Sequence, residues 1–309
     1  MDLKKASLNF GKVNCVDGSK FTVKNETSKN ADVTFHAEVG SFVNDTICII
    51  IVTRLRAAGC VFAEDEARLL ISAARTLDDL TTMVDRRVAG LPLEHVIGWA
   101  EFCGLRIMVD PGVFVPRNRT EFLVRQAAAL TRKGAVVVDL CCGSGALGAA
   151  LAATQERIEL HASDIDPAAV QCALRNVTAT GGHVYEGDLY EPLPATLRGR
   201  VDVLVANVPY VPTEAIKLLP SEARIHEARV ALDGGADGLD VQRRVAAAAP
   251  DWLAPGGHLL VETSERQAKQ TVEIFARNGL IPQVACSNEL DATVVIGTRP
   301  ACLSRINGR

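Results

Sequence analysis

The stretch Val136-Val-Val-Asp-Leu-Cys-Cys-Gly-Ser-Gly-Ala-Leu-Gly148 places a glycine-rich turn directly after an apolar run. The run is typical of a buried parallel strand, and Gly143, Gly145 and Gly148 have GxGxxG spacing at the start of the helix that follows. Asp164 ends the next predicted strand, 19 residues after Gly145. A glycine turn lets a ligand approach the backbone, and a carboxylate at the neighbouring strand end can bind a ribose. The pattern predicts a nucleoside cofactor, either a nicotinamide dinucleotide or S-adenosylmethionine, and plain packing of a strand-helix junction is the competing interpretation.

Apolar strands and amphipathic helices alternate on both sides of this stretch. Helices are expected at residues 119–132, 146–154, 167–179, 239–252 and 265–277. Strands are expected at residues 135–140, 158–163, 183–186, 201–206, 257–262, 281–286 and 292–298. Regular alternation of this kind predicts a parallel α/β sheet with helices on both faces, in a domain that spans residues 119–299.

The chain before residue 119 has a different character. Residues 1–46 are short alternating segments between turn residues, and they predict a strand-rich appendage of unassigned role. Apolar residues at helical spacing predict a helical unit over residues 47–90, with helices at 64–75 and 77–89. The segment 91–118 is rich in glycine and proline and is expected to be a linker, with 101–108 and 112–115 paired in a hairpin. Residues 300–309 form a tail.

The composition is that of an ordinary globular protein of about two domains. The chain has 309 residues, of which 48% are hydrophobic and 23% charged, and its net charge of −4 argues against a dedicated duplex-DNA binder. Nine cysteines without CxxC spacing predict free thiols and no metal site. The longest apolar run, residues 47–52, is too short to span a membrane, and the start lacks the apolar core of a signal peptide. We therefore expect a cytoplasmic protein without membrane contact.

A second motif, Val203-Leu-Val-Ala-Asn-Val-Pro-Tyr210, ends the fourth predicted strand of the sheet. Asn207 supplies an amide oxygen, and the carbonyl of Val208 is held outward because Pro209 follows it. The ring of Tyr210 adds a flat face beside these two acceptors. Two hydrogen-bond acceptors and a flat face suit a planar NH2 group. A hydride-transfer enzyme does not require such a site. A strand-ending turn that merely employs Asn and Pro is the alternative.

Four motifs carry a resemblance to a known family: Asp139 with residues 143–145 (GSG), residues 163–167 (SDIDP), residues 187–192 (GDLYEP) and residues 207–210 (NVPY). Together they resemble the motifs of class I S-adenosylmethionine-dependent methyltransferases, and specifically the HemK/PrmC family of protein-glutamine methyltransferases. Further matching segments are residues 87–98, 101–121, 231–239 and 255–257, with Glu262 and Gln267. The resemblance covers residues 55–298.

The resemblance implies a Rossmann-like sheet of seven strands, the last of which runs antiparallel, after a helical unit that helps to hold the substrate protein. It implies S-adenosylmethionine as the cofactor. The acceptor would be a glutamine side-chain amide in a protein, with peptide chain release factors as the family's typical substrates.

By the same resemblance the cofactor site comprises strand ends and a preceding wall: Pro116, Arg117, Asp139, Cys141, Gly143, Gly145, Asp164, Ile165, Asp188, Leu189 and Asn207. The two glycines would line the methionine part, and Asp139 would face its ammonium group directly or through water. Asp164 would bind the ribose. Asp188 and Leu189 would lie beside the adenine.

The resemblance assigns methyl transfer to Asn207, Val208, Pro209 and Tyr210. Asn207 and the Val208 carbonyl would accept both hydrogens of the glutamine amide. Positioning of the poorly nucleophilic nitrogen, rather than a strong base, would then do most of the catalytic work.

Three departures from the family pattern carry information. Val208 replaces a proline of the usual Asn-Pro-Pro-Tyr, but the position contributes a backbone carbonyl, so the acceptor is retained. Cys141 stands where glycine is frequent, and Asn118-Arg119 replaces a Pro-acid pair. The helical unit is also shorter than usual, which affects substrate choice.

Other interpretations stay open on the sequence alone. The acceptor pair also suits an exocyclic amino group of adenine or guanine in a nucleic acid, although the negative charge disfavours it. A non-catalytic binding module on the same fold and a nicotinamide dehydrogenase are further alternatives. Arginines such as Arg87 and Arg244 are interpreted as solvated helix faces. The sequence does not indicate the oligomeric state.

Overall fold

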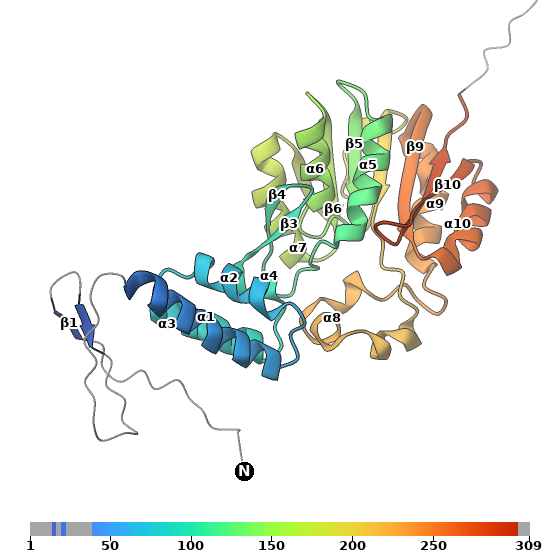
Figure 1. Ribbon diagram of the computed structural model, residues 1–309. Coiled ribbons are helices and arrows are strands. Elements are labelled where there is room, and N and C mark those ends of the chain that lie inside the picture. The colour runs from blue at the N-terminus through green and yellow to red at the C-terminus, as the bar shows by residue number, and fades with distance from the viewer. Residues whose placement is uncertain (1–13, 17–19, 23–38, 302–309) are drawn as a thin grey trace, which may run out of the picture. The chain divides into compact units, whose positions relative to one another are not determined.

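The computed structural model describes residues 14–16, 20–22 and 39–301 (Figure 1). The chain divides into two compact units, Met1–Ala89 and Gly90–Arg309. Most of the predicted strand-rich appendage, residues 1–46, lies outside the described residues, and so does most of the predicted tail. Among the helices of the described segments, none is long and apolar enough to cross a membrane.

The first unit is built around three helices. They are α1 (Val39–Ala57), α2 (Ala63–Ala73) and α3 (Leu77–Val88), and two short antiparallel strands precede them, β1 (Asn14–Val16) and β2 (Lys20–Thr22). Because α1 begins at Val39, the predicted boundary at residue 47 is wrong, and residues 39–46 are helical. Their β-branched and turn-forming residues resemble a strand locally. They nevertheless continue the helix whose later turns bury Ile51 and Leu55.

An ion pair lies inside this helical unit. Arg87, interpreted above as a solvated arginine, is only 7% exposed, and its Nε lies 2.6 Å from Oε2 of Glu66. A buried guanidinium requires such a partner, since an unpaired buried charge costs several kcal/mol. Helical spacing predicts which positions face inward, but it does not reveal that a charged residue occupies one of them.

The second unit contains a seven-stranded sheet. Its strands are β5 (Val136–Leu140), β6 (Glu159–Asp164), β7 (His183–Glu186), β8 (Val201–Ala206), β9 (Leu253–Thr263), β10 (Ile281–Ser287) and β11 (Ala292–Thr298). Their order is β10-β11-β9-β8-β5-β6-β7, and β11 alone runs antiparallel to both of its neighbours. The predicted Rossmann-like fold, with an antiparallel last strand, is confirmed.

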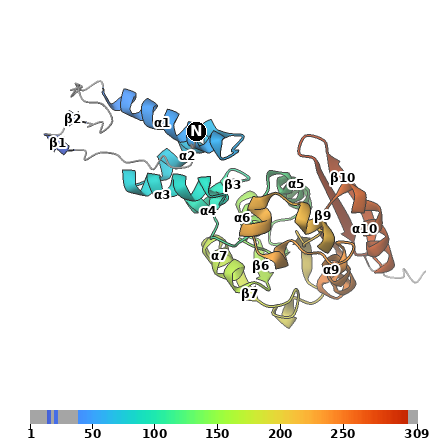
Figure 2. The same ribbon diagram turned by 90° about the horizontal axis from the view of Figure 1, so that it is seen from below.

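Helices cover both faces of this sheet. One face packs against α5 (Glu121–Leu130), α6 (Ala146–Thr154) and α7 (Pro167–Val177), and the other against α9 (Asp240–Trp252) and α10 (Glu265–Arg277), which runs alongside β10 in Figure 2. Successive side chains of a strand point to opposite faces, so Val137 packs in the first layer and Val136 and Val138 in the second. The first and last residues predicted for α6 and α10 are those of the structure.

The predicted linker belongs to the second unit. It contains α4 (Leu93–Ile97) and a hairpin of β3 (Trp99–Phe102) and β4 (Leu105–Met108). Phe102 and Ile107 are buried in the core that also contains α5 and α6, so this segment is part of the fold rather than a spacer. The predicted pairing of 101–108 with 112–115 is wrong, because the strands pair within 99–108 and Gly112 instead accepts a hydrogen bond from Ala228 N at 3.0 Å.

Several helices of three to six residues follow no predicted pattern. They are η1 (Asn118–Thr120), η2 (Thr178–Thr180), η3 (Ala195–Leu197), η4 (Thr213–Leu218), α8 (Ser221–His226) and η5 (Arg229–Ala231). Helices of this length are too short to display a 3.6-residue period. Three of them, η4, α8 and η5, connect β8 to α9, and residues of α8 and η5 border the cavity described next.

Candidate functional site

A cavity of about 770 Å³ opens at the carboxyl edge of the sheet, around the end of β5. The chain order reverses there, with β6 on one side of β5 and β8 on the other, and such switch points are where open α/β sheets bind ligands. Twelve predicted residues line the cavity: Pro116, Arg117, Cys141, Gly143, Asp164, Ile165, Asp188, Leu189, Asn207, Val208, Pro209 and Tyr210. Its volume lies in the range of small-molecule sites, roughly 300–1,000 Å³.

Asp164 ties the glycine loop to the end of β6. Its Oδ2 accepts a hydrogen bond from Gly143 N at 2.8 Å, and its Oδ1 accepts one from Asp166 N at 2.9 Å. Burial raises the pKa of Asp164, and these backbone N–H groups oppose the shift. Gly143 has a φ of 55°, and a Cβ added there would meet nothing within 4 Å. The loop therefore presents open backbone to the cavity beside a fixed carboxylate.

Two predicted cofactor residues, Asp139 and Gly145, do not line the cavity. Gly145 has a φ of 76°, and a Cβ there would lie 2.7 Å from Val177 Cγ2, so this glycine permits the loop to pack against α7. Asp139 lies fully buried beneath the loop, and its Oδ2 accepts a hydrogen bond from Gly148 N at 2.9 Å.

The other carboxylate oxygen of Asp139 has no hydrogen-bond partner among the described residues. Burial raises the pKa of Asp139 to about 7. An orphaned, buried oxygen beneath a glycine loop is a group that a nearby cation would stabilise. Together with the cavity volume, this arrangement fits a nucleoside cofactor that carries an ammonium group.

The end of the cavity beside β7 is bordered by an ion pair. Arg244 of α9 places Nη2 2.6 Å from Oδ2 of Asp188, and both residues line the cavity. Arg244 is exposed on α9, as the interpretation of a solvated helix face predicts, and it pairs in addition with a carboxylate at the cavity. Ser163 Oγ donates to Leu189 O at 2.8 Å, which holds the same turn against β6.

Cys141, in the left-handed region with a φ of 54°, also borders this end of the cavity. Burial and three nearby carboxylates raise the pKa of its thiol well above the ordinary value, so it stays protonated. Cys142 is buried and behaves likewise. Neither sulfur has the lowered pKa of a cysteine nucleophile. In the described segments, no group of three or more His, Cys, Asp or Glu side chains could hold a metal ion.

The motif after β8 forms the opposite end of the cavity. Asn207 is partly exposed, whereas Val208 is 1% exposed and packs its side chain into the core shared with α9. Within the described part of the chain, neither the side-chain oxygen of Asn207 nor the Val208 carbonyl accepts a hydrogen bond. The cavity wall therefore contains two free acceptors in succession.

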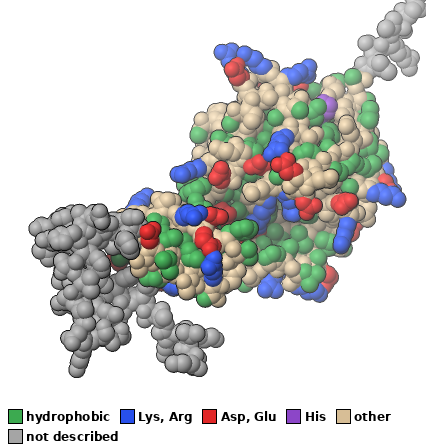
Figure 3. Space-filling view, in the orientation of Figure 1, with side chains coloured by type: hydrophobic (Ala, Val, Ile, Leu, Met, Phe, Trp, Pro, Cys, Tyr) green, Lys and Arg blue, Asp and Glu red, His purple; other side chains and the backbone are tan. Residues whose placement is uncertain are grey.

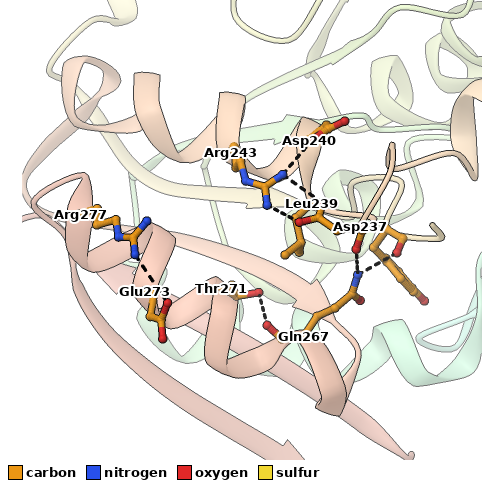
Figure 4. A network of polar contacts seen from close by, with 9 residues as sticks. Asp237, Leu239, Asp240, Arg243, Gln267, Thr271, Glu273 and Arg277 are labelled. Atoms are coloured by element: carbon orange, nitrogen blue, oxygen red, sulfur yellow. Dashed lines mark hydrogen bonds and ion pairs between the residues drawn. The ribbon is translucent and has the colours of Figure 1, made fainter. Parts of the chain in front are cut away.

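A network centred on Gln267 holds this motif in place (Figure 4). Gln267 Nε2 donates to Tyr210 O and to Asp237 O, at 3.1 Å each, while Ser264 Oγ donates to Gln267 Oε1 at 2.6 Å. Ser264 also caps α10 by accepting from Gln267 N at 3.3 Å. One helix start thus fixes the backbone of the acceptor motif.

The glycines of residues 231–239 allow their backbone to approach the acceptor motif closely. A Cβ on Gly234 would lie 2.7 Å from Pro209 O, and one on Gly238 would lie 2.3 Å from Tyr210 O. Val211 N donates to Leu232 O at 3.1 Å in the same contact. Residues 231–239 are part of the family resemblance, and these close approaches explain why glycine occupies positions 234 and 238.

Sequence reasoning missed the roles of two cavity arginines. Arg119 and Arg244 both line the cavity, and each contacts a carboxylate that lies more than 50 positions away in the chain. Arg119 is visible in the sequence only as a departure from the family pattern. No periodic signal could have identified either contact.

Several known methyltransferases are similar to this chain. The family model described as Methyltransferase small domain matches residues 104–239. Release factor glutamine methyltransferase of Geobacter sulfurreducens is 38% identical over 219 residues, which are 70% of this chain and 76% of that protein. A 4-amino-L-phenylalanine/4-methylamino-L-phenylalanine methyltransferase of Streptomyces pristinaespiralis is 36% identical over 203 residues, 63% of this chain and 69% of that protein. A methyltransferase structure from Pyrococcus furiosus matches with a TM-score of 0.49 at 17% identity, over 64% of this chain and 90% of that one.

Proposed function

Because the chain belongs to the family of release factor glutamine methyltransferases, we propose that it transfers the methyl group of S-adenosylmethionine to a glutamine side-chain amide of a peptide chain release factor. The observation that carries the proposal is the pair of free acceptors, the Asn207 side chain and the Val208 carbonyl, at one end of the cofactor-sized cavity.

The cavity residues can hold S-adenosylmethionine in one direction. Asp164, tied to the glycine loop, is suited to the ribose hydroxyls, and Asp188 with Leu189 to the adenine. Gly143 would then hold the methionine part, and Asp139 beneath the loop would supply the counter-charge for the ammonium group. When bound, the cofactor supplies an electrophilic methyl group on a sulfonium.

Asn207 and Val208 orient the acceptor. The side-chain oxygen and the carbonyl each accept one N–H of the glutamine amide, so its nitrogen is directed at the methyl group. The N–C bond forms as the S–C bond breaks, S-adenosylhomocysteine leaves, and the surplus proton on nitrogen passes to water. Tyr210, whose pKa burial raises to about 12, stays protonated at neutral pH and acts as a platform and not as a base.

Two other classes of methyl acceptor are an aromatic amine, which one relative favours, and a nucleic acid, which the distribution of surface charge disfavours. The relative that methylates 4-amino-L-phenylalanine is 36% identical, so an aromatic amine is a candidate acceptor. A nucleic acid is less favoured, because Lys and Arg side chains alternate with Asp and Glu over the face drawn in Figure 3 and do not gather into one basic patch. Both classes enter the test as competing substrates.

Incubation of the full chain with labelled S-adenosylmethionine tests the proposal. Four acceptors are offered separately: a release factor, a release factor denatured before use, RNA, and 4-amino-L-phenylalanine. We expect label in the native release factor, on a glutamine located by peptide mass spectrometry. Label in RNA or in the amino acid alone would overturn the proposal.

Replacement of Asn207 by alanine tests the acceptor pair. We expect turnover to fall about 100-fold or more, with cofactor affinity within about threefold, because positioned donors and acceptors contribute on this scale. Asn288→Ala, at an exposed position in the turn between β10 and β11, is the matched control and should retain full activity. Undiminished turnover of Asn207→Ala would exclude the two-acceptor mechanism.

A further inference from the structure

Arg119 makes two contacts at the acceptor end of the cavity. It belongs to η1, immediately before α5, and its Nε donates to Glu262 Oε1 at 3.2 Å. Its Nη2 donates to the hydroxyl oxygen of Tyr210. The Tyr210 hydroxyl in turn lies 3.5 Å from the same oxygen of Glu262. Three elements, η1, the end of β9 and the turn after β8, therefore meet at one hydroxyl group.

Glu262 is the fixed point of this cluster. Its side chain is 3% exposed, whereas that of Arg119 is 46% exposed. A carboxylate buried to this degree requires a cationic partner, and Arg119 provides it. Burial raises the pKa of Glu262 and the Arg119 guanidinium opposes that shift, while Oε1 of Glu262 serves as an acceptor whose position the β9 strand determines.

The guanidinium group suits this task better than an ammonium group would. Its Nε and Nη2 donate in one plane, to Glu262 and to Tyr210 respectively. A lysine would neutralise Glu262 but would not supply two donors in a fixed geometry. The two contacts are thus separable by substitution.

The hydroxyl contact completes the immobilisation of Tyr210. Gln267 fixes the backbone carbonyl of Tyr210, and Arg119 with Glu262 fixes the far end of its side chain. The ring between these two anchors borders the cavity next to Asn207 and Val208. A ring held at both ends has one orientation toward an acceptor group placed on those two residues.

We propose that Arg119 is a positioning residue for methyl transfer, which locks the ring of Tyr210 against the acceptor amide through its contact with the tyrosine hydroxyl. This inference rests on the proposed function, since the acceptor is the one proposed above. It adds a residue that the family pattern does not suggest, because the sequence there departs from the usual Pro-acid pair.

The test separates the charge of Arg119 from its geometry. Arg119→Lys should keep the melting temperature and the affinity for S-adenosylhomocysteine, and lower kcat by about 10- to 100-fold, the effect of losing a charged hydrogen bond in the transition state. Arg125→Ala, on an exposed face of α5 where Arg125 lies 3.6 Å from Glu121, is the control and should leave kcat unchanged.

Further variants exclude a purely structural role. Arg119→Ala leaves Glu262 unpaired and should lower the melting temperature, and Glu262→Gln in the same chain should restore the melting temperature but not kcat. Tyr210→Phe should lower kcat as Arg119→Lys does. The double variant Arg119→Lys/Tyr210→Phe should be no slower than the slower of its two single variants, because both substitutions remove the same contact between Arg119 and the Tyr210 hydroxyl.

The outcomes distinguish the proposed function from the role of Arg119. Absence of turnover by the unaltered chain on every glutamine substrate would overturn the proposed function and this inference with it. Turnover by the unaltered chain, with Arg119→Lys at the same rate, would overturn the inference alone. Recovery of kcat together with stability in Arg119→Ala/Glu262→Gln would also overturn it, since the role would then be structural.

Discussion

Replacement of Asp139 by asparagine removes a carboxyl group that the fold buries completely. One oxygen accepts from Gly148 N at 2.9 Å and the other has no partner in the described part of the chain. Burial, opposed by the Gly148 N–H and reinforced by the charge of Asp164, raises the pKa of Asp139 from 3.8 to about 7. Asparagine keeps an oxygen for Gly148 and carries no charge.

The sign of the effect follows from the proton count. Between pH 3.8 and about 7 the folded chain retains a proton that the unfolded chain has released, so the free energy of unfolding falls as pH rises through this window. A difference of about 3 pKa units corresponds to about 4 kcal/mol at most. We therefore expect Asp139→Asn to be more stable than the parent chain by up to about 4 kcal/mol above pH 7, with the difference shrinking toward pH 4.

Urea denaturation at a series of pH values from about 4.5 to 8.5 measures this difference directly. Asp251→Asn, at an exposed position on α9, is a matched control for the loss of one carboxyl group. A stability difference between Asp139→Asn and the parent that does not change with pH would refute the argument from burial.

The same group bears on cofactor binding. A cation bound over the glycine loop, above Asp139, favours the carboxylate, so affinity for S-adenosylhomocysteine should fall by up to about tenfold per pH unit below pH 7 in the parent chain. The slope should be absent in Asp139→Asn. It should also be absent for 5′-methylthioadenosine, which has no ammonium group, and a slope with that ligand would assign the titration to another group.

Three further variants test the walls of the cavity. Gln267→Ala removes both hydrogen bonds that hold the carbonyls of Tyr210 and Asp237, and we expect kcat to fall about tenfold or more with little change in cofactor affinity, measured by steady-state kinetics and calorimetry. Val208→Pro keeps the backbone carbonyl, so turnover should stay within a few-fold of the parent, and a complete loss would contradict the backbone role. Arg244→Ala frees the carboxylate of Asp188, and a change in S-adenosylhomocysteine affinity without a change in kcat at saturation would place this pair at the adenine end.

The sequence predicts the sheet well because its signals are local. Ser264 caps α10 by accepting a hydrogen bond from Gln267 N, and α7 begins with Pro167 after the N-cap Asp166, so both helix starts agree with the prediction. Strands buried on both faces are continuous apolar runs, of which residues 203–206 in β8 are an example.

What the sequence does not predict depends on distant contacts. The hairpin of 99–108 belongs to the sheet unit because Asn176 of α7 both accepts from Met108 N and donates to Met108 O, at 2.9 Å each. The pairing of Arg244 with Asp188 likewise joins positions 56 residues apart. Composition and periodicity describe each segment alone, so neither contact has a signal in them.

The fixed surroundings of the acceptor motif explain how a weak nucleophile can react there without a strong base. Residues 207–210 are held from three sides: by Gln267 of α10, by the close-packed backbone of residues 232–238, and by Arg119 with Glu262. Each contact restrains the backbone or the ring and leaves the two acceptor oxygens free for substrate. An amide nitrogen has little basicity to exploit, so the rate must come from alignment, and alignment requires acceptors that do not move. We therefore propose that the polar contacts around this motif contribute to the rate by limiting its motion.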